Sequence, residues 1–192
     1  MNPSLTACLL VLGIVGCAAD RGADKVVRDF LTARNRYDLR AVSDLVTEDV
    51  VMRDPLALPS GGRKAVLARV RWDSVLSSQW RWTGTTVHGD TVTFRRLAET
   101  STWHQILGIG LVERDTTRFV VRAGRVSEIV LGGLDVASET RLRAALDDFL
   151  PWALHEFPER LARTRPDGLF DPDPRRGADW LSLIRIWSDS AK

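Results

Sequence analysis

The chain has 192 residues and a mass of 21.4 kDa, enough for one domain with a hydrophobic core and an extension. Hydrophobic residues make up 44% and charged residues 27%, which excludes a disordered tail and a membrane protein with several spans. The 27 basic and 25 acidic residues leave a formal charge of only +2, so the composition predicts no nucleic-acid partner.

The first residues differ from the rest, because every Lys, Arg, Asp and Glu lies at Asp20 or later. Residues 5–15 form an apolar run too short to cross a membrane but suited to the h-region of a secretory signal. The run ends in Ile14-Val15-Gly16-Cys17, which resembles the lipobox of bacterial lipoproteins. This resemblance implies a signal peptide over residues 1–17 and acylation of Cys17. The protein would then be lipid-anchored at the bacterial cell envelope, with its domain outside the cytoplasm and no other membrane contact. The alternative is a buried N-terminal helix with two incidental cysteines.

Apolar residues at helical spacing predict three helices in the next part of the chain. The first begins after Asp24 and ends near Arg36, and a second short helix follows Asp38. A brief strand at residues 50–52 and a loop at residues 58–62 lead to a third helix over residues 63–79.

The pattern then changes to β-branched and aromatic residues, which predicts strands. Residues 81–87 and 91–98 form a hairpin around a turn at residues 88–90, and residues 113–122 and 125–131 form a second pair. Residues 100–110 between the pairs are expected to be irregular or a single helical turn. Helices followed by antiparallel strands specify an α+β fold.

The segment after Ser138 is helical again and predicts an extension over residues 138–192. Pro151 is expected to break or kink its first helix. Trp180, Leu183, Ile184 and Trp187 form an apolar stripe on its last helix. An undocked extension would expose a large hydrophobic patch, so we expect it to pack on the domain.

The order of these elements resembles the cone-shaped NTF2-like fold, in its SnoaL-like branch. The resemblance covers about residues 23–135 and is carried by Phe30-Leu31, Asp38-Leu39-Arg40, and residues 50–55, 99–109 and 118–126. It implies a cone formed by a curved antiparallel sheet with N-terminal helices, over a domain at residues 20–135, with the C-terminal helical extension outside it. This family hosts isomerases, cyclases, dehydratases, epoxide hydrolases and plain binding modules, so function has to be argued from the cone's interior.

Enzymes of the family place a carboxylate inside the cone, often beside a Tyr, His or Arg. Glu99 and His104 are the candidate catalytic pair, one taking a proton from an apolar substrate and the other returning it. The alternative is that Glu99 binds loop backbone and His104 is a partly exposed loop residue. The candidate ligand contacts are Tyr37, Asp54, Trp82 and Trp103. The aspartate–arginine–aspartate arrangement of the epoxide hydrolases and the tyrosine–aspartate pair of the isomerases find no match residue by residue.

Strict alternation along residues 113–122 predicts which side chains face the interior of the cone. Phe119 and Val121 would share the inner face with Glu113, Asp115 and Thr117. The outer face would carry the arginines of this strand, Arg114, Arg118 and Arg122.

No metal-binding, phosphate-binding or serine-hydrolase motif is present, so no metal and no cofactor is expected. We therefore expect a domain that binds a small apolar molecule, or a partner protein, without catalysis. One alternative is a cofactor-free isomerase, cyclase or dehydratase acting through Glu99 and His104. Another is a structural module that forms a homodimer through its sheet. An open cavity with two polar groups within hydrogen-bond reach would favour an enzyme, and an open cavity without them would favour binding. A cavity filled by Trp82 or Trp103 would favour the structural role.

Overall fold

The computed structural model describes residues 22–58 and 60–190, so the signal peptide and Cys17 predicted above lie outside the described part. The N-terminal elements are α1 (Ala23–Asn35), α2 (Leu39–Leu45), β1 (Val46–Arg53), β2 (Ser60–Gly61) and α3 (Arg63–Val75). The middle elements are β3 (Gln79–His88), β4 (Thr91–Thr100), α4 (Thr102–Ile106), β5 (Leu111–Arg114), β6 (Thr117–Arg122) and β7 (Arg125–Val130). The C-terminal elements are α5 (Val136–Glu156), α6 (Pro158–Thr164), the 3-10 turn η1 (Pro166–Gly168) and α7 (Pro174–Ser190).

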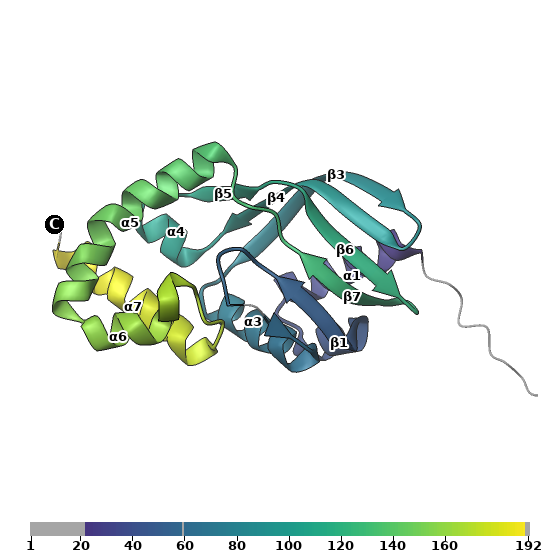
Figure 1. The fold of residues 1–192 in the computed structure, drawn as a ribbon, viewed down its shortest axis with the longest axis horizontal. Helices are drawn as coiled ribbons and strands as arrows, with labels where there is room; N and C mark the ends of the chain where they lie inside the picture. The colour runs from purple at the N-terminus through teal and green to yellow at the C-terminus, as the bar shows by residue number, and fades with distance from the viewer. Residues whose placement is uncertain (1–21, 59, 191–192) are drawn as a thin grey trace, which may run out of the picture.

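The strands form one open sheet in the order β2-β1-β7-β6-β4-β3, in which only the β1–β7 pair is parallel. The long strand β4 connects two regions, because its first half pairs with β6 and its second half with β5. Helices α1 and α3 lie against one side of this curved sheet (Figure 1). The α+β fold with N-terminal helices and a C-terminal helical extension is thus confirmed.

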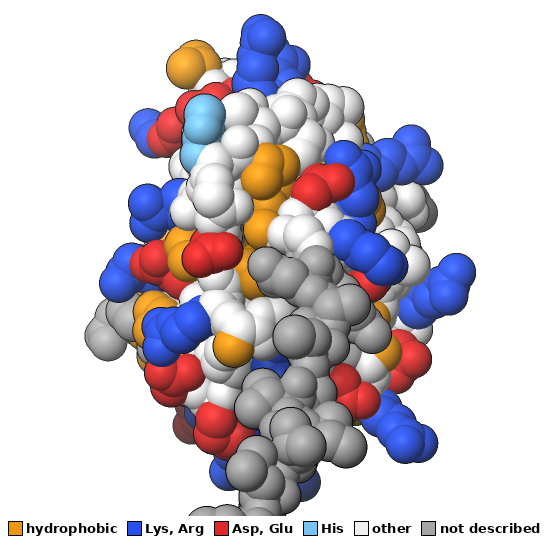
Figure 2. Space-filling model, turned by 90° about the vertical axis from the view of Figure 1, so that its right-hand side faces the viewer, with side chains coloured by type: hydrophobic (Ala, Val, Ile, Leu, Met, Phe, Trp, Pro, Cys, Tyr) orange, Lys and Arg blue, Asp and Glu red, His pale blue; other side chains and the backbone are white. Residues whose placement is uncertain are grey.

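The C-terminal helices gather at one end of the molecule, far from the tip of the β3–β4 hairpin (Figure 1). Helix α7 contacts α3 and α4, and α5 contacts β5. At the opposite end, basic and acidic side chains are interspersed around small groups of hydrophobic ones (Figure 2). None of the helices in the described part of the chain is long and apolar enough to cross a membrane.

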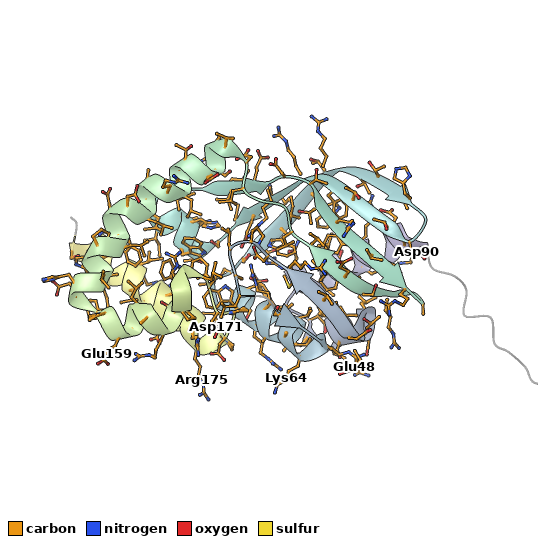
Figure 3. All side chains as sticks on the ribbon, in the orientation of Figure 1. Glu48, Lys64, Asp90, Glu159, Asp171 and Arg175 are labelled. Atoms are coloured by element: carbon orange, nitrogen blue, oxygen red, sulfur yellow. The ribbon has the colours of Figure 1, made fainter. Side chains whose placement is uncertain are left out.

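The hydrophobic interior is divided into two clusters. The first, here called the cone core, lies between the N-terminal helices and the sheet and includes Val26, Phe30, Leu31, Trp80, Phe94 and Phe119. The second, here called the tail core, joins the C-terminal helices to α3, α4 and β5, and includes Trp72, Trp103, Phe149, Trp180, Leu183 and Ile184. Side chains from the tail helices and from the sheet project into the region between them (Figure 3).

Residues 113–122 are not one strand, and this changes the direction of Arg114. The chain leaves the ladder at Asp115, whose backbone N–H donates to the Gly133 carbonyl instead (2.9 Å). The two residues between β5 and β6 reverse the alternation, so Arg114 is only 3% exposed. The prediction that Arg114 faces outward is wrong, whereas Arg118 and Arg122 are exposed as predicted.

Three other boundaries differ from the prediction. Helix α3 ends at Val75, because Ser77 adopts a positive φ of 52° and the chain turns into β3. Glu99 therefore lies on a strand, since β4 extends to Thr100. Helix α5 continues through Pro151, where the buried neighbours Phe149 and Ala153 hold it against the tail core.

Candidate functional site

A chain of alternating charges runs through the interior between the two cores. Arg34 pairs with Asp73 (2.8 Å), Asp73 with Arg69 (3.2 Å), Arg69 with Asp54 (2.9 Å), and Asp54 with Arg114 (3.1 Å). Each of these five ion-paired side chains is at most 10% exposed. Each charge is therefore stabilised by the opposite charges beside it rather than by hydration.

Helical periodicity explains why these charged side chains are buried. On α1, Arg34 continues the buried stripe formed by Val27, Phe30 and Leu31. On α3, Arg69 and Asp73 share the buried face with Val66 and Val70. The two stripes turn their charged members toward one another, and the Arg34–Asp73 pair joins the helices.

Ser78 connects this chain of ion pairs to Glu99 on β4. The Ser78 hydroxyl accepts a hydrogen bond from Arg34 Nη2 (2.8 Å) and donates one to Glu99 Oε1 (2.7 Å). The buried cluster then holds three guanidinium groups and three carboxylates, so its charges cancel when His104 is neutral.

The pKa values of Asp54 and Glu99, which belong to this cluster, and of the neighbouring His104 are all lowered from their usual values. Burial alone would raise the pKa of Asp54, but Arg114 and Arg69 lower it to about 2. Burial opposes ionisation of Glu99 as well, yet the positive charges around it, protonated His104 and the guanidinium groups of Arg114, Arg69 and Arg34, hold its pKa below the usual range. At neutral pH only the guanidinium groups carry this charge. Burial lowers the pKa of His104 to about 4, although the Glu99 carboxylate opposes this shift. At neutral pH both carboxylates are ionised and His104 is neutral.

A cavity of about 120 Å³ lies between the charged cluster and the tail core. Its polar lining consists of Asp54, Arg69, Glu99, His104, Arg114 and Arg165. Its apolar lining includes Trp72, Leu76, Trp103, Val112, Leu142 and Phe170. An engineered apolar cavity of similar size, about 150 Å³ in another protein, holds one benzene molecule, so this cavity could enclose a group of about one ring.

Three nitrogen atoms of the lining are buried without a hydrogen-bond partner among the described residues. These atoms are Nδ1 of His104, Nε of Arg114 and Nε of Arg165. Buried polar atoms are normally paired, so a bound molecule with a hydrogen-bonding group would satisfy them.

Beside the cavity, two depressions that are more open to solvent lie on the surface between α5 and the segment around η1. Leu146 and Arg165 line the cavity and both depressions. Leu146 is half-buried, so it stands between the outer surface and the interior cavity.

The structure brings together four of the six residues that the sequence predicted for the site. Glu99, His104, Asp54 and Trp103 line the cavity. Trp103 forms a wall and does not fill the space.

Tyr37 and Trp82 are not among the lining residues. The Tyr37 hydroxyl donates to the Ser78 carbonyl (2.9 Å) and accepts from Gln79 (2.8 Å), so it stabilises the position of Ser78 beside the charged cluster. Trp82 packs near Phe94 at the cone core, with ring centroids 6.0 Å apart.

The residues of the site that were not predicted from the sequence are Arg34, Arg69, Asp73, Arg114 and Arg165. Charged residues inside the apolar stripes of α1 and α3 were a usable signal for the first three. Arg69 and Asp73 form a local i,i+4 pair on α3, whereas the pair of Arg69 with Asp54 depends on the tertiary fold, since it joins α3 to the end of β1.

The cone, its helices and the buried polar cluster define a domain of the NTF2-like class. A model of the SnoaL-like domain family matches residues 27–129, which is more than half of the chain. The chain belongs to this SnoaL-like family. The matched range ends before α5, so the helices that close the cavity lie outside the family domain.

Solved structures with the same fold share little sequence with this chain. An LEH-like epoxide hydrolase of Mycobacterium tuberculosis has a TM-score of 0.52 at 18% identity, over 67% of this chain and 95% of its own. An epoxide hydrolase/cyclase-like enzyme with a role in pyran ring formation in the polyether salinomycin has a TM-score of 0.51 at 16% identity, over 60% and 92%. An NTF2-like protein of unknown function from Cytophaga hutchinsonii has a TM-score of 0.50 at 10% identity, over 62% and 94%. At these identities the likeness shows the fold alone.

No curated protein matches the chain. Within the described ranges, no three His, Cys, Asp or Glu side chains are grouped so that they could hold a metal ion.

Proposed function

We propose that this protein binds a small, mostly apolar molecule in the cavity between the charged cluster and the tail core, without acid–base catalysis. The proposal is carried by two features of the cavity. Its space is mostly apolar and large enough for one ring, and its titratable lining residues Asp54 and His104 do not change protonation state near neutral pH. General acid–base catalysis works best when the catalytic pKa lies near the working pH. The pKa values of about 2 for Asp54 and about 4 for His104 are unsuited to that task at neutral pH.

The polar lining still contributes to this proposed role. Neutral His104 has an Nδ1 atom without a partner among the described residues, and this atom can donate or accept depending on the tautomer. A hydrogen bond to a ligand carbonyl or hydroxyl would orient the ligand, while Trp72 and Trp103 supply apolar contact.

Native mass spectrometry of the full chain purified from its own host tests the proposal, because a bound ligand adds a discrete mass. We expect such a mass in the wild type and its loss in Leu146→Trp, which places a larger side chain at the entrance. Val87→Trp, on the exposed part of the β3–β4 hairpin, is the matched control and should keep the ligand. A wild-type mass without any addition would contradict the proposal.

The alternative is a cofactor-free isomerase, cyclase or dehydratase that uses Glu99 and His104. It is favoured by one observation, namely that both side chains line the same cavity and influence each other's pKa. The ligand identified by mass spectrometry separates the two functions. Conversion of that molecule to an isomer or dehydrated product by the wild type, but not by Glu99→Gln, would establish the enzyme.

A third proposal, a homodimer through the sheet, is tested by the mass of the particle in solution. A stable dimer with an empty cavity would favour this structural role over ligand binding.

We also propose that the domain is anchored at the cell envelope through an acylated Cys17. The support is the apolar run at residues 5–15 and the lipobox-like Ile14-Val15-Gly16-Cys17. Labelled palmitate should appear on the protein expressed in bacteria and vanish in Cys17→Ser. Unchanged labelling of that variant would contradict the anchor.

A further inference from the structure

We infer that Arg165 recognises a carboxylate on the bound molecule, so that the cavity takes a small apolar carboxylic acid of about one ring. This inference rests on the proposed function and names the chemical class of its ligand. Arg165 follows α6 and lines both the cavity and the outer depressions, so it stands where a bound molecule meets the entrance.

Arg165 differs from the other arginines of the cavity in having no acidic partner among the described side chains. Arg69 and Arg114 each form an ion pair with Asp54. Among the described side chains, no carboxylate lies within ion-pair distance of Arg165. The only hydrogen bond from its guanidinium group to these residues runs from Nη2 to the Gly168 carbonyl (2.6 Å), and its buried Nε has no partner among them.

The guanidinium group of Arg165 is held in place by aromatic rings. Its central carbon lies 5.0 Å from the Phe170 ring centroid and 5.9 Å from that of Trp180. Such packing fixes the plane of the group, which leaves N–H donors along its edge for a planar anion. A half-buried cation without a counter-ion is unfavourable, and burial lowers the pKa of Arg165, so a ligand carboxylate would remove this penalty.

The other charges around the cavity set the orientation of the ligand. Asp54 and Glu99 are ionised on the inner wall, where Arg69 and Arg114 pair with Asp54 and the Ser78 hydroxyl donates to Glu99, so a second carboxylate gains nothing there. Asp147 lines the two outer depressions, but it is exposed to water. The carboxylate is therefore expected at Arg165, with the apolar part of the ligand against Trp72 and Trp103.

Calorimetric titration of the full chain with phenylacetate and with its neutral counterpart phenylacetamide tests this inference. Phenylacetate should bind at least about tenfold more tightly, the value for a charged hydrogen-bonded pair. Arg165→Gln should remove this preference while leaving the affinity for phenylacetamide unchanged. Arg165→Lys should restore part of the preference, and Arg163→Gln, an exposed position in the last turn of α6, should have no effect.

Equal affinity for both compounds would overturn the inference, and so would an equal loss of both in Arg165→Gln or no binding of either. Leu146→Trp separates this failure from failure of the proposed function. If both compounds bind equally and Leu146→Trp abolishes both, the cavity binds ligands but Arg165 does not select an acid. If binding of phenylacetate is unaffected by Leu146→Trp, the cavity is not the site and both proposals fail.

Discussion

Arg34 on α1 and Asp73 on α3 form an ion pair of 2.8 Å in which the two side chains are 1% and 2% exposed. The pair connects the helix that covers the cone core to the helix that contacts the tail through α7. Arg34 also stacks over Trp80 at 4.0 Å and binds Ser78, so one side chain holds three elements together.

Breaking this ion pair should destabilise the protein strongly. Arg34→Met leaves Asp73 buried with only Arg69 as partner, and removing one member of a buried pair costs about 3–5 kcal/mol. Urea unfolding measures the loss, and Lys25→Met is the control, because its exposed pair with Asp29 on the same helix is worth under about 1 kcal/mol. The double variant Arg34→Met with Asp73→Leu should lose less than the sum of the single losses. Strictly additive losses would show that the two side chains act independently.

Stability should fall as the pH decreases through the range in which unfolded His104 takes up a proton. The unfolded residue titrates near 6.5 and the folded one near 4, so the unfolded state binds more protons between these values. The free energy of unfolding is therefore not reduced by His104 above about pH 6.5 and falls progressively as the pH is lowered toward 4. The expected loss between pH 7 and pH 5 is about 2 kcal/mol.

Urea unfolding at the two pH values measures this loss. His104→Phe should flatten the dependence, whereas His88→Asn, at an exposed position, should leave it unchanged. The same pH dependence in wild type and His104→Phe would contradict the assignment.

The tail core should depend more on Trp180 than on Trp187. Trp180 is completely buried, and its ring centroid lies 5.0 Å from that of Phe170 and 5.2 Å from that of Phe149. Trp180→Ala should cost about 3–5 kcal/mol, and Trp187→Ala less, since Trp187 is only partly buried. Thermal unfolding gives the order of the two losses, and equal losses would argue against this core.

Removal of the chain after Ser138 should leave an aggregating product. Trp72, Trp103 and Val112 would lose the α5 and α7 side chains that cover them. Light scattering of the truncated protein measures this. A monomeric product as stable as the full chain would show that the tail is an independent arm.

A side chain at Gly132 should disturb the break between β5 and β6 that turns Arg114 inward, and so destabilise the protein. A Cβ at Gly132 would lie 2.5 Å from the Asp115 carbonyl oxygen, whereas a Cβ at Gly133 would meet nothing within 4 Å. Gly132→Ala should therefore cost about 1–3 kcal/mol, with Gly133→Ala as the matched control. Similar unfolding midpoints for the two variants would contradict this geometry.

The elements whose periodicity extends over many residues could be predicted from the sequence. The stripes on α1 and α2 and the β3–β4 hairpin have strong local patterns, and they were predicted within a few residues of their observed bounds, while for α7 the stripe was predicted without bounds. Pro151 does not break the helix, one of the two outcomes expected for it, because the loss of one backbone hydrogen bond is outweighed by the packing of Phe149 and Ala153 on either side.

The site was less predictable, because it depends on non-local pairing. Nothing local distinguishes Arg114 from Arg118, and only the departure of Asp115 to pair with Gly133 places the first inside and the second outside. The cavity itself lies between the family domain and a tail whose docking position no periodicity specifies.

The measurement that tests the central claim most directly is nuclear magnetic resonance of the tryptophan indole groups during titration with the ligand recovered from the native protein. Trp72 and Trp103 line the cavity, while Trp82 lies at the cone core. The account predicts that the indole signals of Trp72 and Trp103 shift with ligand concentration, that Trp82 stays unchanged, and that Leu146→Trp abolishes the shifts. Shifts at Trp82 with unchanged signals from Trp72 and Trp103 would contradict it.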